Sequence, residues 1–246
     1  MSAGRIHVGT SGWHYGHWVG PFYPEGLASD ARLAHYAQTF AAVELNNSFY
    51  QLPDAASLEA WCDATQPGFL FACKASRYIT HMKKLKDPDA STPKFFAAVD
   101  ALGAKLGPIL FQLPPRWRAA PERLDAFLAA LPAGHRYAFE FRDASWWSEE
   151  VEAILRAHGA AFCAFDLEGR QSPLPVTADF VYLRLHGPDG AYQGSYDDAA
   201  LERWAAWLGG RRDEGRDVFC FFDNDEAGYA PADAARLQAM LASVDA

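Results

Sequence analysis

Eight short runs rich in β-branched and aromatic residues recur along the chain, and segments with helical spacing separate them. Runs of this kind are typical of buried strands, and strands that alternate with helices favour a parallel sheet. Eight strands favour closure into a (β/α)₈ TIM barrel over an open doubly wound sheet. The predicted strands are Ile6–Thr10, Ala42–Asn46, Phe69–Lys74, Ile109–Leu113, Tyr137–Arg142, Ala161–Asp166, Phe180–His186 and Asp217–Asp223.

The segments between these strands carry helix signals. Thr92 before Pro93 is typical of an N-cap followed by proline at the first helical position. Ser148 precedes two glutamates that suit the positive end of a helix dipole. The connection 167–179 is short and holds two prolines, so we expect the sixth helix to be vestigial. No domain linker stands out, and we expect a single domain over residues 1–246.

Polar residues keep to one alternate position in the predicted strands and gather toward their C-terminal ends. Alternate residues of a barrel strand face the lumen, and active sites of these barrels lie at the C-terminal mouth. A lumen that only has to be filled uses branched apolar side chains instead. The polar residues predicted at the mouth are Glu44, Asn46, Lys74, Gln112, Glu140, Arg142, Asp166, Arg184, His186, Asp223 and Asn224.

Two interpretations of this polar set are open. Its four carboxylates, three cations and one histidine can form compensating ion pairs that plug the barrel, because an unpaired buried ion costs several kcal/mol. The same groups can line a ligand pocket. Their position at the mouth favours the pocket.

The loops at the same end are rich in aromatic residues. Such side chains stack on sugar or base rings, or close over a small ligand. The alternative is a hydrophobic cluster that packs the loops against the barrel. The loop residues that we predict to contact a ligand are Trp13, Tyr15, Tyr50, His81 and Trp146.

The 246 residues have the composition of a globular protein, with 50% hydrophobic and 22% charged side chains. A net charge of −9 disfavours non-specific binding to nucleic acid and to anionic membranes. The segment 70–95 nevertheless carries a net charge of +4, and Arg116 and Arg118 follow the next strand. An ordinary solvated charge run is one explanation. The other, which we adopt, is a small anionic ligand such as a phosphate or carboxylate.

We expect a cytoplasmic protein, because the sequence shows no targeting signal and its cysteines have no disulfide or metal-ligand pattern. The N-terminal residues do not form a signal peptide, and no stretch approaches about 20 apolar residues, so we expect no membrane contact. The four cysteines form no CxxC pair and no metal-ligand spacing. We expect them to be reduced core residues.

Seven strings of the sequence, in order, resemble those of the DUF72 family, also called YecE-like proteins. They are GTSGWHYGHWVGPFYP, VELNNSFYQLP, FACKASRYITH, GPILFQLPPRW, FEFRDASWW, VYLRLHG and FFDNDEAGYAP. The resemblance runs from about Ile6 to the last helix and implies a TIM-barrel fold. It carries no accepted catalytic set. The family usually reads Asn-Asn-Asp after the last strand, where this chain reads Asp223-Asn224-Asp225 and so adds a carboxylate.

Three functional hypotheses follow. The first is an enzyme without metal or redox cofactor that performs acid–base chemistry on a small anionic or phosphorylated substrate. Its catalytic residues would be Glu44, Glu140 and His186, and Lys74 and Arg184 would bind the anion.

The second hypothesis is a metal-dependent phosphodiesterase or nucleic-acid repair-like hydrolase that uses a divalent ion. Against it, the chain has no HxH or HExxH spacing. The third is a non-catalytic ligand-binding or scaffold protein, which would use the same residue types. None of the three predicts an oligomeric state.

Overall fold

All eight predicted runs form strands in the computed structural model, which describes residues 3–243. The fourth strand begins three residues earlier than predicted. The strands are β1 (Ile6–Thr10), β2 (Ala42–Leu45), β3 (Leu70–Lys74), β4 (Leu106–Leu113), β5 (Tyr137–Phe141), β6 (Ala161–Leu167), β8 (Phe180–Leu185) and β9 (Asp217–Phe222).

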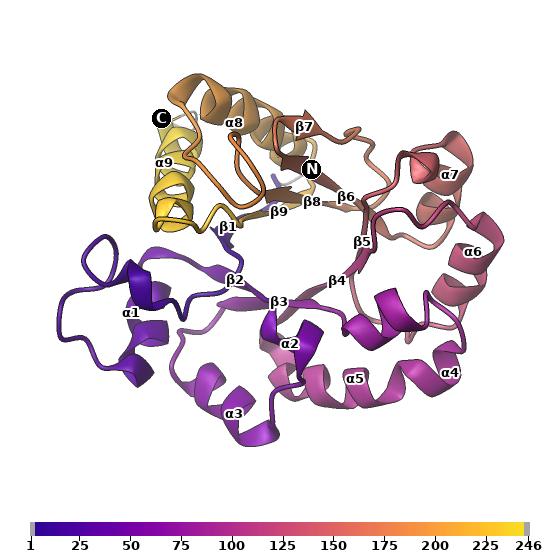
Figure 1. Ribbon diagram of the computed structural model, residues 1–246, viewed down its shortest axis with the longest axis horizontal. Helices are drawn as coiled ribbons and strands as arrows, with labels where there is room; N and C mark the ends of the chain where they lie inside the picture. The colour runs from indigo at the N-terminus through magenta and orange to yellow at the C-terminus, as the bar shows by residue number, and fades with distance from the viewer. Residues whose placement is uncertain (1–2, 244–246) are drawn as a thin grey trace.

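The strands are parallel, and hydrogen bonds link them in the order β1-β9-β8-β6-β5-β4-β3-β2. The two ends of this path, β1 and β2, lie side by side, so the sheet curves into a barrel ringed by helices (Figure 1). The predicted (β/α)₈ TIM barrel is therefore confirmed.

Helices follow most strands and pack on the outside of the barrel (Figure 1). They are α1 (Arg32–Thr39), α2 (Asn47–Tyr50), α3 (Ala55–Asp63), α4 (Pro88–Ser91), α5 (Pro93–Val99), α6 (Pro121–Ala129), α7 (Glu149–Ala157), α8 (Asp198–Asp213) and α9 (Tyr229–Ser243). Short 3₁₀ turns and one π-helical turn, Tyr78–Met82, complete the connections.

The two predicted helix starts differ in how they are capped. The Ser148 hydroxyl accepts a hydrogen bond from the Val151 backbone N–H, as predicted for α7. Thr92 precedes Pro93 at the start of α5, but its hydroxyl donates to the Pro88 carbonyl at 2.8 Å. Thr92 is therefore the N-cap residue of α5 with Pro93 at the first helical position, as predicted, but its hydroxyl does not cap α5, because α4 runs directly into α5 and leaves Thr92 in a helical conformation.

The connection from β6 to β8 contains no helix among its residues, all of which the structure describes. Instead the chain turns back as β7 (Arg170–Gln171), which pairs antiparallel with the end of β6. The Ser172 hydroxyl and amide then bond the backbone of Phe165 at 2.9 Å each. A short reversed strand thus stands where we predicted a vestigial helix.

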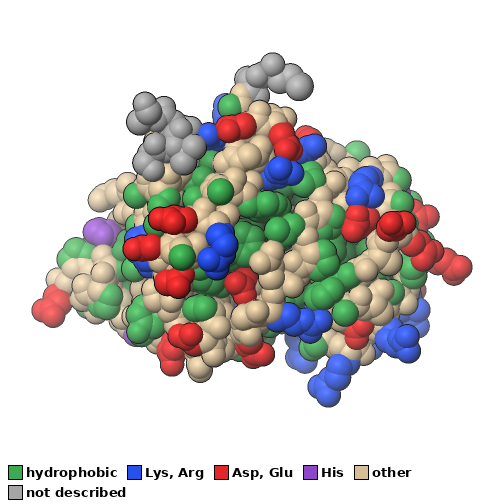
Figure 2. Space-filling view, turned by 90° about the horizontal axis from the view of Figure 1, so that it is seen from above, with side chains coloured by type: hydrophobic (Ala, Val, Ile, Leu, Met, Phe, Trp, Pro, Cys, Tyr) green, Lys and Arg blue, Asp and Glu red, His purple; other side chains and the backbone are tan. Residues whose placement is uncertain are grey.

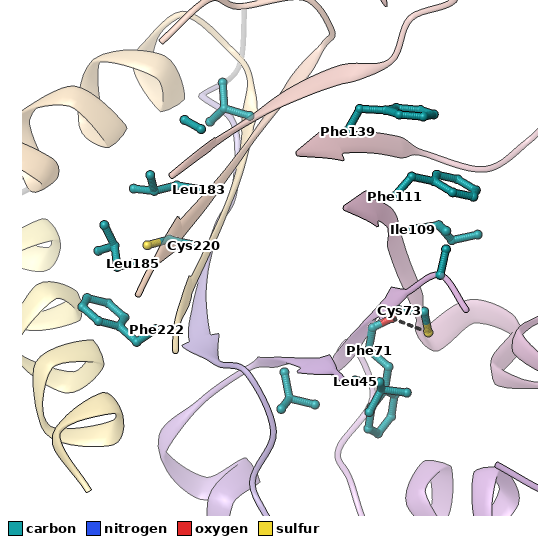
Figure 3. Packing of buried hydrophobic residues seen from close by; sticks show 14 of the residues in the cluster. Leu45, Phe71, Cys73, Ile109, Phe111, Phe139, Leu183, Leu185, Cys220 and Phe222 are labelled. Carbon is teal, nitrogen blue, oxygen red and sulfur yellow. Dashed lines mark hydrogen bonds between the residues drawn. The ribbon is translucent and has the colours of Figure 1, made fainter. Parts of the chain in front are cut away.

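The alternation along the strands separates two apolar layers. Side chains on the outer faces point toward the helices and form the main core (Figure 3). A second, smaller cluster fills the lower lumen. It consists of Ala42, Ala72, Leu110, Ala138, Ala161, Cys163, Phe180, Tyr182, Phe219 and Phe221.

A tyrosine hydroxyl helps to close the seam between β1 and β2. The Tyr36 hydroxyl accepts from the Thr10 backbone N–H at 2.9 Å and donates to the Ala42 carbonyl at 3.0 Å. Gly9 lets the strands approach, since a Cβ there would lie 2.1 Å from the Ala42 oxygen. The Gly12 N–H donates to the Glu44 carbonyl at 2.8 Å and closes the seam at the mouth.

The molecular surface carries both signs of charge. Acidic and basic side chains are intermingled around hydrophobic ones on the face that Figure 2 shows. No helix within residues 3–243 has the length and apolar character needed to cross a bilayer. All four cysteines are free thiols, and three of them are buried.

Replacing Tyr36 by Phe should lower the free energy of unfolding by about 1–3 kcal/mol, because two buried backbone groups lose their partner. Urea denaturation measures the loss. Tyr229→Phe, at a tyrosine that is 38% exposed, is the matched control and should change little. A Tyr36 variant as stable as this control would contradict the seam described here.

Candidate functional site

A polar layer lies above the apolar lumen, at the C-terminal ends of the strands. Most of its members continue the lumen-facing positions of the cluster below them, two residues beyond a member of that cluster. They are Ser11, Glu44, Lys74, Gln112, Glu140, Arg184, His186 and Asp223, with Arg142 just beyond β5.

Arg184 of β8 is the centre of this layer, and its side chain is only 1% exposed. Its Nη2 donates to Glu44 at 2.7 Å and to Asp223 at 3.0 Å, and its Nη1 donates to Glu140 at 2.9 Å. These carboxylates come from β2, β5 and the end of β9. The Arg184 Nε also donates to Glu44, and Nη1 lies 3.2 Å from His186 Nε2. All five guanidinium N–H groups therefore have acceptors.

Glu44 of β2 is a fully buried acceptor. Besides Arg184, it accepts from the Ser11 hydroxyl at 2.6 Å and from the Tyr182 hydroxyl at 2.7 Å. Every contact is a donor to this carboxylate, which therefore acts as an anion. Burial, followed by the charge of Glu44, raises the pKa of Tyr182 well above its ordinary value and keeps that hydroxyl protonated.

Glu140 of β5 is held between two guanidinium groups. Arg184 contacts one oxygen, and Arg142 Nε donates to the other. Burial by itself would raise the pKa of Glu140, but the charges of Arg142 and Arg184 outweigh it and hold the pKa well below the ordinary value. The Arg142 guanidinium lies 4.8 Å from the centre of the Phe165 ring.

The contacts of His186 define its tautomer. Its Nε2 lies 2.9 Å from Arg142 Nη2 and 3.2 Å from Arg184 Nη1, and guanidinium groups only donate. Nε2 is therefore the unprotonated nitrogen, and Nδ1 carries the hydrogen. Nδ1 lies 3.0 Å from Asp223 Oδ2, a close contact that lacks hydrogen-bond geometry. Burial opposes ionisation of Asp223, but Arg184 and His186 lower its pKa.

Lys74 ends β3 in a different setting. Its ammonium lies 4.7 Å from the Phe49 ring centre, and no ion pair or hydrogen bond of its side chain is present within residues 3–243. Burial, then the like charge of Arg184, lowers the pKa of Lys74. His81 packs edge-on against the same Phe49 ring at 5.0 Å. Burial and the charge of Lys74 lower the pKa of His81 to about 4, so its imidazole is neutral.

The rim of the mouth carries opposite charges on two sides. After β9, a pocket of about 380 Å³ is lined by Tyr15, Tyr192 and three carboxylates, Asp223, Asp225 and Glu226. Burial raises the pKa of Tyr15, so its hydroxyl remains a donor. The loop after β3 instead exposes basic residues, including Arg77, Lys84 and Lys86. The basic rim predicted from the sequence is thus one half of a bipolar mouth.

The two predicted ligand-binding tryptophans are largely buried by loop and helix residues, although Trp13 also lines a pocket beside the mouth. Trp13 is nearly buried and packs edge-on against Trp61 of α3, with ring centres 5.0 Å apart. Trp146 is fully buried, and its indole N–H donates to the Trp117 carbonyl at 2.7 Å. Both pack the loops down, which was the alternative interpretation of the loop aromatics.

Two polar residues also lie away from the lumen. Cys163 and Phe165 occupy the lumen face of β6, so Asp166 lies on the outer face. The prediction that Asp166 points into the lumen is wrong because Phe165 takes that position. Asn224 is buried, and its amide donates to Asp233 at 2.8 Å, a contact that anchors α9.

The remaining predicted residues flank the site. Gln112 faces the lumen, and its side-chain amide donates to the Leu113 carbonyl at 2.6 Å. Tyr50 is 82% exposed at the end of α2. Asn46 lines a pocket of about 670 Å³ beside the mouth, together with Trp13 and Tyr15. The Asn46 side-chain oxygen is buried and has no hydrogen-bond partner within the described chain.

The predicted site omitted Ser11, Tyr182 and Phe165. Tyr182 precedes Arg184 by two residues and so shares its face, which the alternation could have shown. Ser11 and Phe165 act through contacts between strands that only the folded barrel brings together. Within residues 3–243, no group of three or more His, Cys, Asp or Glu side chains could hold a metal ion.

Comparison with known proteins gives a consistent family. The family model described as "Protein of unknown function DUF72" matches residues 7–246. The UPF0759 protein YunF of Bacillus subtilis is 28% identical, over 92% of this chain and 90% of its own length.

Solved structures are similar over nearly the whole chain. A DUF72 family protein from Thermotoga maritima, TM1631, is 29% identical with a TM-score of 0.86, covering 97% of this chain and 99% of its own. A DUF72 family protein from Enterococcus faecalis, EF0366, shares the fold at 17% identity, with a TM-score of 0.79 and coverage of 96% and 95%.

Arg184→Met should destabilise the protein by about 3–5 kcal/mol, because three carboxylates would lose their shared cation. Arg136→Met, at an arginine that is 40% exposed and pairs with Asp217 at the opposite, N-terminal end of the strands, is the control and should cost less than about 1 kcal/mol. Denaturant titration of both variants measures the difference. Equal losses would show that the central arginine does not organise the polar layer.

Acid should destabilise the fold through Glu140 and Asp223. Both carboxyl groups have lowered pKa values in the folded state, so their contribution is complete above the ordinary values and disappears as the pH falls through the lowered ones. The free energy of unfolding should therefore fall steadily below about pH 4.5. A stability that stays constant from about pH 5 to pH 3 would be inconsistent with this network.

Proposed function

The chain belongs to the DUF72 family, and we propose that it is an enzyme that performs acid–base chemistry on a small anionic substrate at the mouth of its barrel. The C-terminal mouth is where barrels of this class place their reactive groups. Here that mouth holds ionisable side chains from β2, β3, β5, β8 and β9. A lumen that only has to be filled contains branched apolar side chains instead of ionisable ones.

The observation that carries the proposal is that the three mouth cations differ in how many of their N–H groups have acceptors within the protein. All N–H groups of Arg184 are used inside the protein. Arg142 uses Nε and Nη2, while its Nη1 makes no hydrogen bond within the described residues. The Lys74 ammonium meets only the Phe49 ring. Lys74 and Arg142 therefore supply the donors for an anion, and the basic loop after β3 attracts it.

Lys74 is also the group best suited to move a proton. Its lowered pKa brings the amine closer to neutral pH, where a catalytic acid or base is most efficient. Glu44 and Glu140 were predicted to be catalytic, but each is a buried carboxylate saturated by donors. In our proposal they position Arg184 and Arg142. His186 also positions Arg142, because its unprotonated Nε2 accepts a hydrogen bond from Arg142 Nη2.

The proposal leaves out a divalent metal ion for a geometric reason. Arg184 lies between Glu44, Glu140 and Asp223, in the position that a cation bound by these carboxylates would need. A metal would have to displace a guanidinium with five acceptors. A purely binding role for the same mouth differs from ours in one respect, because it gives no reason for a lysine of lowered pKa at position 74.

Titration calorimetry with inorganic phosphate tests the anion site. We expect the wild-type protein to bind phosphate and Lys74→Met to bind at least about tenfold more weakly, because a partly desolvated charge pair is lost. Arg156→Met removes the same charge from the exposed end of α7 and should bind like the wild type. Undiminished binding by Lys74→Met would refute the assignment of Lys74 to the anion site.

A further inference from the structure

The lysines of this chain are few and confined to one region. The sequence has 22 Lys and Arg residues, of which only six are lysines, and all six lie between residues 74 and 105. The mouth itself has three cations, Arg142, Arg184 and Lys74. A guanidinium stays protonated in proteins, whereas a buried amine readily loses its proton. Lys74 is thus the mouth cation that can exist as a neutral nucleophile.

The surroundings of Lys74 favour that neutral form. The charges of Glu140 and Glu44 raise the pKa of Lys74, but both carboxylates are already bonded to the guanidinium group of Arg184. Burial of the amine and the like charge of Arg184 oppose protonation, and they outweigh the cation–π contact of the ammonium with the Phe49 ring at 4.7 Å. A lysine that is desolvated and placed beside another cation is the kind that attacks carbonyl groups.

A second lysine in the same chain shows what a structural lysine looks like. Lys105 donates from its ammonium to the Cys62 carbonyl at 2.5 Å, to the Thr65 carbonyl at 2.7 Å and to the Thr65 hydroxyl at 2.9 Å. These three acceptors use all three of its N–H groups. Lys74 has none of these acceptors and is partly open at the mouth.

We propose that Lys74 is a catalytic nucleophile that forms an imine with the aldehyde or ketone group of a small anionic substrate. The inference rests on the function proposed above and names its substrate class, a carbonyl compound that also carries a carboxylate or phosphate. Arg142 Nη1 is the donor available for that anionic group.

The chemistry balances without an oxidant or a metal. The amine lone pair attacks the carbonyl carbon, a C–N bond forms, and the C=O π pair moves to oxygen. A proton passes from nitrogen to that oxygen and gives a carbinolamine. Protonation of the hydroxyl and loss of water then leave the iminium ion, and water reverses the sequence. In this scheme the neutral His81 imidazole, which contacts the same Phe49 ring as Lys74, carries these protons.

Borohydride trapping tests the inference. The wild-type protein is incubated with glyoxylate, an aldehyde that carries a carboxylate, and sodium borohydride reduces any imine to a stable carboxymethyl amine. Peptide mass mapping then compares the six lysines. We expect Lys74 to be labelled at least about tenfold faster than the exposed Lys94, because its amine is desolvated, lies beside the charge of Arg184 and has no hydrogen-bond acceptor within the described residues.

The Lys74→Arg variant separates the two proposals. It retains the positive charge and should still bind inorganic phosphate, but it cannot form an imine and should lose the fast label. Labelling of Lys74 no faster than of Lys94, with phosphate binding intact, would overturn the imine and spare the anion site. Fast labelling of Lys74 without phosphate binding would support the imine and refute the anion site. Neutral acetaldehyde should show a smaller preference for Lys74 than glyoxylate.

Discussion

One buried guanidinium, that of Arg184, is the interaction on which the rest of the site depends. It is 1% exposed and bonds carboxylates from β2, β5 and the end of β9. Each of these ions would cost several kcal/mol to bury alone. The cost is offset only when all the strands are in register, because the guanidinium fork has fixed directions. Closing the barrel and assembling the mouth are therefore the same event.

Because all N–H groups of Arg184 have acceptors within the protein, the function that we propose assigns ligand contacts to the groups around it. Glu140 and His186 fix the orientation of Arg142, and Asp223 lies 3.0 Å from the other ring nitrogen of His186. Lys74 stands beside this ordered set without joining it. For the anionic substrate that we propose, the acidic rim after β9 and the basic rim after β3 favour an approach with its anionic end toward the β3 side.

Much of the barrel could be predicted from alternation, since period two sets the face of every strand residue. This logic placed Glu44, Lys74, Glu140 and Arg184 together correctly. It failed for Asp166, because Phe165 occupies the lumen position of β6. It also could not decide which aromatic residues face a ligand. Trp146 is buried because of a contact with Trp117, 29 residues away, that no local pattern encodes.

The strand order determines when the barrel can close during synthesis on the ribosome. Within the described chain, β1 pairs in its ladder only with β9, and the contact between Arg5 and Asp217 joins residues 212 positions apart. At about 5–20 residues per second, the first strand waits roughly 10–40 s for its partner. Glu44 meanwhile remains hydrated, since Arg184 is also made late. The nascent chain thus has no buried ions to neutralise until the moment when their counter-ions arrive.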